Sequence, residues 1–118
     1  MKYLVKATRA LSDETRLRIL SLLIDRDCCV CEVMQALDIS QTRASRNLSI
    51  LHDSGFLKLT KDGIWSVYAL DREGMSVALL GLVDAVGEGM AGTPEASLDR
   101  ARLKRARRVG VTWVKRSV

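Results

Sequence analysis

The sequence predicts a mostly helical α+β fold with a single small β-hairpin, carried by a chain of 118 residues. Apolar residues recur at helical spacing along most of the chain, whereas strand-like alternation occurs once, on either side of an Asp-Gly turn signal. A chain of this length, with 47% apolar residues, can bury a core of its own. No apolar run approaches the ~20 residues that cross a bilayer, so we expect no membrane partner.

Four helices are expected in the first half of the chain. Residues 3–11 have helical character, and Ser12 is a plausible N-cap for a second helix that ends near residues 25–27. A short third helix should cover about residues 30–37, with Val33, Met34 and Leu37 facing inward. Ser40 can cap a fourth helix that continues to about residue 52. Gly55 suits the left-handed position after its end.

The hairpin follows, with strands at residues 56–61 and 64–70. Asp62-Gly63 between them is a strong signal for a two-residue hairpin turn. Residues 65, 67 and 69 alternate with residues 64, 66 and 68, as a small sheet with one packed face requires.

A long apolar helix should come next, with Asp71 as its cap and an apolar stripe over residues 75–86. A helix this apolar in a small domain buries more than one face, and Gly81 would let another helix approach closely. We therefore expect a homodimer that forms through the N-terminal helix and this long helix. Residues 1–92 would be the main domain, which contains this dimer interface, and residues 93–118 a basic C-terminal helix or tail that begins at Thr93-Pro94.

Charge is unevenly distributed, although the net charge is only +5. From Asp99 to the end, eight Lys and Arg residues face one acidic residue, whereas residues 1–98 are slightly acidic. A basic tail suits a polyanionic partner, but it is equally consistent with a solvated helix.

The predicted order of the elements is that of a winged helix-turn-helix. The helix from Ser40 presents short hydroxyl residues and two arginines on its outer face, with no acidic residue before Asp53. Such a face can enter the major groove of operator DNA while a basic hairpin follows the phosphates. Each feature alone also occurs on ordinary surfaces, but their order favours DNA binding, with residues 1–92 as the DNA-binding and dimerisation domain. The candidate DNA contacts are Ser40, Gln41, Thr42, Arg43, Ser45, Arg46 and Ser49 on the helix, and Lys58 and Lys61 on the hairpin.

All three cysteines fall within four residues: Cys28, Cys29 and Cys31. The chain start lacks the long apolar segment of a secretory signal, so we expect a cytoplasmic protein, in which clustered thiols suggest metal or redox chemistry. In a continuous helix, Cys29 and Cys31 would point about 200° apart, and Cys28 and Cys31 within about 60°. A chelate through Cys29 and Cys31 therefore requires a non-helical segment or an unwound first turn. A Cys28–Cys31 pair fits a helical start better, and all three thiols could bind one ion only with local distortion. A helix N-terminus would also favour the thiolate form.

Residues 11–70 resemble the ArsR/SmtB family of metal-responsive winged-helix repressors. The resemblance lies in ALSDETRLRIL at residues 10–20, SQTRASRNL at 40–48, LHDSGFL at 51–57 and the hairpin that ends in YAL at 68–70. It implies a dimer that binds an operator and leaves it when an effector binds. DCCVCEV at 27–33 resembles the motif of the arsenic- and cadmium-sensing branches, with Cys29 and Cys31 at its two cysteine positions. Met34 stands where one arsenic-sensing type has a third cysteine, and Cys28 stands where the motif has Leu.

The predicted function is a transcriptional repressor, without a constitutive cofactor, that trivalent arsenic or antimony releases from DNA. The expected ligands are Cys28, Cys29 and Cys31, and the effector would be arsenite, antimonite or methylarsenite, of which the methylated form needs only two thiols. Thiol redox or persulfide sensing and Cd(II) or Pb(II) sensing on the same scaffold stay open, as does a partner-binding module without a DNA role. The sequence has no Gly-rich phosphate loop, metal-type His pair or credible Ser-His-Asp set, so we do not expect an enzyme.

Overall fold

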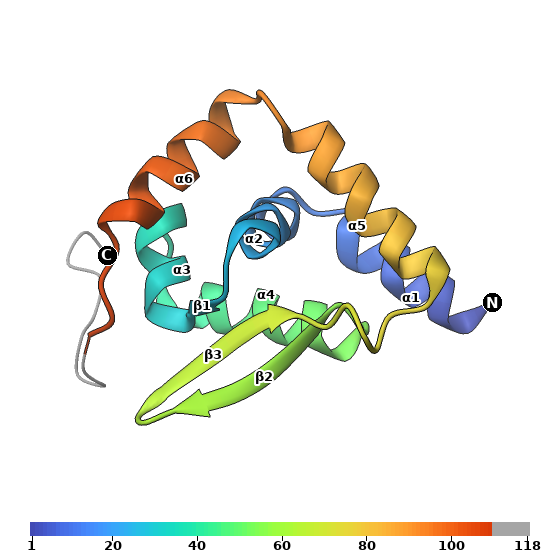
Figure 1. Cartoon of the computed structure of the whole chain (residues 1–118), viewed down its shortest axis with the longest axis horizontal. Coiled ribbons are helices and arrows are strands. Elements are labelled where there is room, and N and C mark those ends of the chain that lie inside the picture. The colour runs from blue at the N-terminus through green and yellow to red at the C-terminus, as the bar shows by residue number, and fades with distance from the viewer. Residues whose placement is uncertain (110–118) are drawn as a thin grey trace.

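The computed structural model describes residues 1–109 and has the predicted winged helix-turn-helix architecture (Figure 1). Every predicted helix and both predicted strands are present, and one short additional strand, β1, is formed by two of the cysteines. The elements are α1 (Lys2–Leu11), α2 (Glu14–Asp25), β1 (Cys28–Cys29), α3 (Val30–Leu37), α4 (Gln41–Asp53), β2 (Leu57–Asp62), β3 (Trp65–Leu70), α5 (Val77–Met90) and α6 (Pro94–Arg105).

Helix α2 lies at the centre of the molecule, and the other helices surround it (Figure 1). Its Ile19, Leu20 and Leu22 are completely or almost completely buried. Each such side chain removed from water stabilises the fold by roughly 1.5–3 kcal/mol. The predicted inward faces of α3 and α4 are confirmed. Val33, Met34 and Leu37 of α3 and Ala44, Leu48 and Leu51 of α4 are all buried.

The predicted cap of α4 is confirmed, and the predicted cap of α2 is wrong. Ser40 Oγ accepts the backbone N–H of Arg43 at 3.2 Å, which satisfies one of the free amides at the start of α4. The prediction that Ser12 caps α2 is wrong by one residue. Ser12 instead ends α1, where its hydroxyl donates to the carbonyl of Arg9 at 3.0 Å, and the carboxylate of Asp13 caps α2.

The sheet has the strand order β1-β3-β2, and both pairings are antiparallel. Asp62 pairs with Trp65, so the two turn residues are 63 and 64, one position later than predicted. Gly63 has a φ of +61°, a conformation that glycine adopts without strain. Because β3 lies between two strands and against the helices, residues 67, 68 and 69 are all buried, and the predicted alternation of exposure is lost.

Helix α5 begins at Val77 and is capped by Ser76, so the prediction of Asp71 as its cap is wrong. The Asp71 carboxylate instead closes a turn by accepting the N–H of Gly74 at 3.2 Å. Helix α6 begins after Thr93, as expected, and packs against α2 and α3. The predicted basic tail continues to residue 118, and its residues 110–118 lie outside the described part of the chain. None of the helices in residues 1–109 has the length and apolarity needed to cross a membrane.

Candidate functional site

The two adjacent cysteines of β1 lie on opposite faces of the sheet. Neighbouring residues of a strand point in opposite directions, and Cys28 pairs with Tyr68 whereas Cys29 pairs with Val67. Cys28 is completely buried, and its thiol donates to the carbonyl of Arg26, with 3.6 Å between sulfur and oxygen. The strand thus separates two thiols that are consecutive in the sequence.

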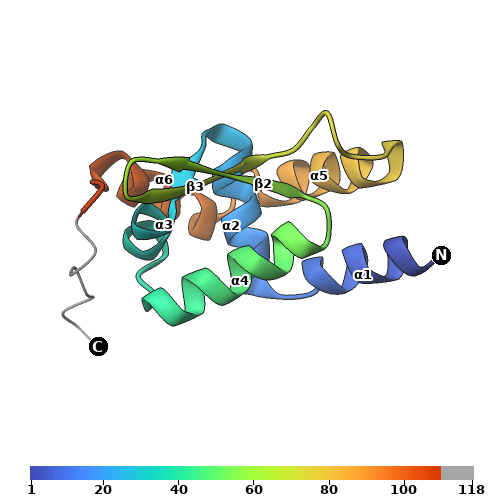
Figure 2. The ribbon, with the colours of Figure 1, turned by 90° about the horizontal axis from the view of Figure 1, so that it is seen from below.

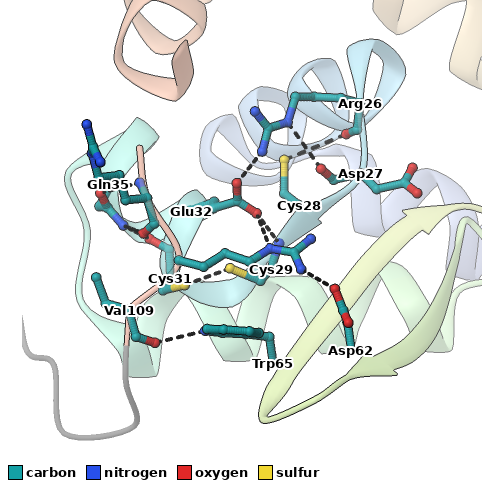
Figure 3. Close-up of polar contacts among 12 residues, drawn as sticks. Arg26, Asp27, Cys28, Cys29, Cys31, Glu32, Gln35, Asp62, Trp65 and Val109 are labelled. Carbon is teal, nitrogen blue, oxygen red and sulfur yellow. Dashed lines mark hydrogen bonds and ion pairs between the residues drawn. The ribbon is translucent and has the colours of Figure 1, made fainter. Parts of the chain in front are cut away.

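Cys29 and Cys31 converge instead, with 2.6 Å between their sulfur atoms (Figure 3). This arrangement is possible because Cys29 has extended backbone angles at the N-cap of α3, and the helix begins only at Val30. These thiols could meet only if the segment is non-helical or the first turn of the helix unwinds. The structure meets the first condition, because Cys29 is not helical. No set of three or more His, Cys, Asp or Glu residues within residues 1–109 is placed to hold one metal ion. The arrangement is a two-thiol site.

Glu32 fixes the geometry of this site through a reciprocal cap. Its carboxylate accepts the backbone N–H of Cys29 at 2.9 Å, and the Cys29 sulfur accepts the backbone N–H of Glu32. Burial opposes ionisation of Glu32, but the N–H and thiol of Cys29 and the guanidinium of Arg26 outweigh it and hold its pKa below the ordinary value. Sequence reasoning missed Glu32, although Cys29-x-x-Glu32 has the spacing of a capping box with sulfur in place of oxygen.

Burial keeps two of the thiols neutral. Desolvation raises the pKa of Cys28 to about 12. Desolvation also raises the pKa of Cys29, and the hydrogen bond with Cys31 adds to this shift. The expectation that a helix N-terminus would favour the thiolate is therefore wrong for Cys29, because the cost of burying the charge exceeds the benefit of the helix end.

The candidate DNA-binding residues lie on α4 and β2. Helix α4 lies on the lower side of the molecule in Figure 2. Gln41, Thr42, Arg43, Arg46 and Ser49 are exposed, and Ser40 and Ser45 are half-buried. Arg43 also donates to Thr15 Oγ at 2.8 Å and so connects α4 to α2. On β2, Lys58 and Lys61 are exposed, and Lys61 donates to Ser66 Oγ at 2.7 Å. The structure brings these residues to the surface of the helix and the wing, where a DNA role remains a prediction.

The family pattern described as "Bacterial regulatory protein, arsR family" matches residues 13–58. Among similar proteins, the arsenic resistance transcriptional regulator ArsR1 of Pseudomonas putida is 39% identical over 88 residues, which cover 70% of this chain and 68% of the relative. The arsenical resistance operon repressor of Escherichia coli is 43% identical over 67 residues, 56% of this chain and 57% of the relative. A Staphylococcus aureus cadmium resistance regulatory protein, a CadC homolog, is 38% identical over 69 residues, again 57% of its own length.

Solved structures share the same fold. Reduced HlyU from Vibrio cholerae superposes with a TM-score of 0.65 at 24% identity and covers 76% of this chain and 90% of its own. The transcriptional repressor BigR from Xylella fastidiosa gives a TM-score of 0.59 at 26% identity, covering 70% of this chain and 77% of its own. A homodimeric winged helix-turn-helix DNA-binding domain from Mycobacterium bovis gives 0.65 at 23% identity, covering 78% and 83%.

Proposed function

Because this chain belongs to the ArsR family of bacterial regulatory proteins, we propose that it represses transcription and leaves its operator when trivalent arsenic or antimony binds Cys29 and Cys31. The protein is a DNA-binding transcriptional regulator, not an enzyme. The observation that carries the effector proposal is the convergence of the two sulfur atoms at the start of α3.

The chemistry of arsenous acid suits a pair of neutral thiols. Each thiol replaces one hydroxyl group on arsenic: an As–S bond forms, an As–O bond breaks, and the thiol proton leaves with the hydroxyl as water. Two such steps leave arsenic with a single remaining substituent, which is a hydroxyl in arsenite and a methyl group in methylarsenite. Cys28 lies on the other face of β1, so we propose that it is not a ligand and that two sulfurs suffice.

Effector binding at this place would reach the DNA-binding helices directly. The sulfur of Cys29 is an acceptor in the cap of α3, and an As–S bond there would consume the thiol proton and draw the sulfur toward arsenic, away from the first amides of the helix. Helix α3 packs against α4, the proposed recognition helix. A changed start of α3 would therefore shift the orientation of α4 in the major groove.

The names of the relatives support a metal or metalloid effector but do not identify which one. Two of them are named arsenic or arsenical resistance regulators, and the Staphylococcus relative is a cadmium resistance regulator. Cd(II) and Pb(II) are thus a second class of effector, because soft thiolates bind them well. These ions require both thiols to ionise, which the burial of Cys29 opposes.

We propose that the operator complex is a homodimer formed through α1 and α5. Met1 and, in the first turn of α1, Tyr3, Leu4 and Val5 expose apolar side chains, and α5 exposes Val77. Gly81 has open space beside it, which would allow close approach of a partner helix. The proposed DNA contacts are those of α4 and β2, and the compartment would be the cytoplasm, where the operator is found.

Cysteine variants test the effector site. We expect Cys29→Ser and Cys31→Ser to bind operator DNA like the wild type but to resist release by arsenite, because each removes one As–S bond. Cys28→Ala should still be released, since its sulfur faces the core. The measurement is fluorescence anisotropy of labelled operator during titration with arsenite, methylarsenite, antimonite, Cd(II) and Pb(II).

Several outcomes would change this assignment. Normal arsenite release in both serine variants would remove Cys29 and Cys31 as the ligands. Loss of release in Cys28→Ala, with its operator affinity intact, would show that three sulfurs are needed. Release by peroxide but by none of the five ions would move the protein to the class of thiol redox sensors.

A further inference from the structure

Residues 106–109, here called the strap, connect the cysteine site to the wing. The strap follows α6 and runs past the start of α3 (Figures 1 and 3). The Gln35 amide fixes it from both sides, accepting the N–H of Arg107 at 3.1 Å and donating to the Arg107 carbonyl at 2.7 Å. The same amide nitrogen of Gln35 donates to the carbonyl of Cys31 at 2.9 Å, so the strap is anchored on the helix that carries the thiol.

The other end of the strap holds the tip of the wing. The Trp65 indole N–H donates to the carbonyl of Val109 at 2.9 Å. The guanidinium of Arg108 lies 5.7 Å from the centre of the Trp65 ring, within the range of a cation–π interaction. It also donates to the carboxylate of Asp62 at 2.5 Å, next to the hairpin turn.

Arg108 contacts the thiol site as well. Its Nε lies 3.5 Å from Oε1 of Glu32, the oxygen that also accepts the backbone N–H of Cys29. A single side chain therefore joins the carboxylate that caps the thiol site to the carboxylate at the wing tip. Arg108 is only partly exposed, and two anionic partners hold it, which distinguishes it from Arg107, the other basic residue of the strap.

We propose that Arg108 is a positioning residue that couples occupancy of the Cys29–Cys31 pair to the position of the wing, an inference that rests on the proposed function. Without effector, the strap holds the wing tip against the start of α3 in the arrangement that binds DNA. An effector on Cys29 consumes the thiol proton that also stabilises the Glu32 carboxylate and displaces the sulfur from the cap, so Glu32 is held less tightly. Arg108 then loses one of its two carboxylates, and the wing is released from α3. A ligand shifts a conformational equilibrium only through contacts that differ between the two states. In this proposal, the contacts that differ are those of Glu32 with Cys29 and with Arg108.

The test compares Arg108→Gln with Arg107→Gln in the full chain. Both variants lose one positive charge from adjacent positions, but within residues 1–109 Arg107 contacts Gln35 through its backbone, which the substitution leaves intact. Without arsenite, we expect Arg108→Gln to bind the operator at least about threefold more weakly than Arg107→Gln, because its wing is no longer held. With saturating arsenite, we expect equal affinities, because the strap is then released in both proteins. The factor by which arsenite weakens operator binding is therefore smaller in Arg108→Gln.

A double-mutant cycle with Asp62→Asn separates this coupling from a general loss of stability. Asp62→Asn should reproduce the effect of Arg108→Gln, and the double variant should be no weaker than either single variant, since both remove the same bridge. In a Trp113→Phe background, Trp65 emission should respond to arsenite, and Arg108→Gln should reduce that response. A merely structural role of Arg108 would weaken operator binding equally with and without arsenite.

The outcomes distinguish this inference from the proposed function. If Arg108→Gln and Arg107→Gln bind the operator with equal affinity without arsenite, the proposed role of Arg108 is overturned, regardless of how arsenite changes operator binding. A wild-type complex that ignores arsenite and the other soft ions overturns the proposed effector. In that case, a weaker Arg108→Gln would still support the strap as a device that holds the wing.

Discussion

At the scale of single residues, the chemistry of the site depends on which way each thiol points. Cys28 and Cys29 are neighbours in the chain, yet one contacts the core and the other meets Cys31 at the start of α3. The sequence placed the cysteine cluster at the head of the helix-turn-helix. The sequence could not show which thiols share a face, because that depends on the pairing of β1 with β3, whose residues come much later in the chain.

The burial of Cys29 predicts different pH dependences for different effectors. Its pKa is raised, so at neutral pH the thiol is protonated, and a divalent ion must displace that proton. We expect the affinity for Cd(II) to rise by at least about tenfold per pH unit between pH 6 and 8. Arsenite binding forms water from the thiol proton and a hydroxyl, so its affinity should change little over the same range.

Isothermal titrations of the free protein at several pH values, in buffers of different ionisation enthalpy, would measure both affinities and the protons released. Cys29→Ser provides the control, because it removes the thiol to which the pH dependence is assigned. A Cd(II) affinity that is independent of pH would contradict the neutral state of the Cys29 thiol.

At the scale of elements, the apolar pattern predicted the helices well, and single capping residues were harder to place. Ser12 and Asp13 are both good N-cap residues, and only the backbone path shows that the first ends α1 while the second begins α2. Likewise, Asp62 and Gly63 form a turn signal in the sequence, but pairing of Asp62 with Trp65 moves the turn by one residue. These errors are local, because the buried faces of the helices decide the architecture.

The exposed apolar residues of α1 predict where the dimer forms. We expect Leu4→Asp to weaken dimerisation by about 30-fold or more, because a charge buried in an apolar interface costs at least about 2 kcal/mol. Leu98→Asp on α6 is the matched control, since Leu4 is 45% exposed and Leu98 50% exposed in the single chain. Analytical ultracentrifugation over a range of concentrations would measure the dimer dissociation constant of each variant.

Operator binding should weaken together with dimerisation in Leu4→Asp, since two half-sites need two recognition helices. If Leu98→Asp dissociated the dimer and Leu4→Asp did not, the interface would lie on α6 instead.

At the scale of the whole molecule, helix α6 is part of the folded body. The sequence predicted a basic helix or tail from residue 93, either solvated or in contact with phosphates. The structure packs residues 94–105 against α2 and α3. Asp99, the one acidic residue among residues 99–118, is 1% exposed and accepts two hydrogen bonds from Arg18, at 2.9 and 2.7 Å. The single acidic residue of this basic segment therefore indicates that α6 packs against the body, which the net positive charge of the segment did not indicate.

This buried pair gives a prediction about stability. We expect Asp99→Asn to lower the free energy of unfolding by about 2 kcal/mol, because Arg18 loses its carboxylate partner in a largely buried position. Asp25→Asn is the control, since Asp25 and Arg100 also join α2 to α6 but lie 4.0 Å apart at the surface, where a pair contributes at most about 1 kcal/mol. Urea denaturation followed by circular dichroism would compare the two variants, and equal midpoints would contradict this role of Asp99.

The two sulfurs of the proposed effector site come from neighbouring residues of one chain. Under the proposed function, each protomer therefore carries a complete binding site, and effector binding to the DNA-free protein depends on the concentration of free effector, whatever the number of copies of the protein. Occupancy of an operator by a dimer depends on copy number as well. A cell that made more of this regulator would tighten repression, while each protomer would still bind the effector with the same intrinsic affinity.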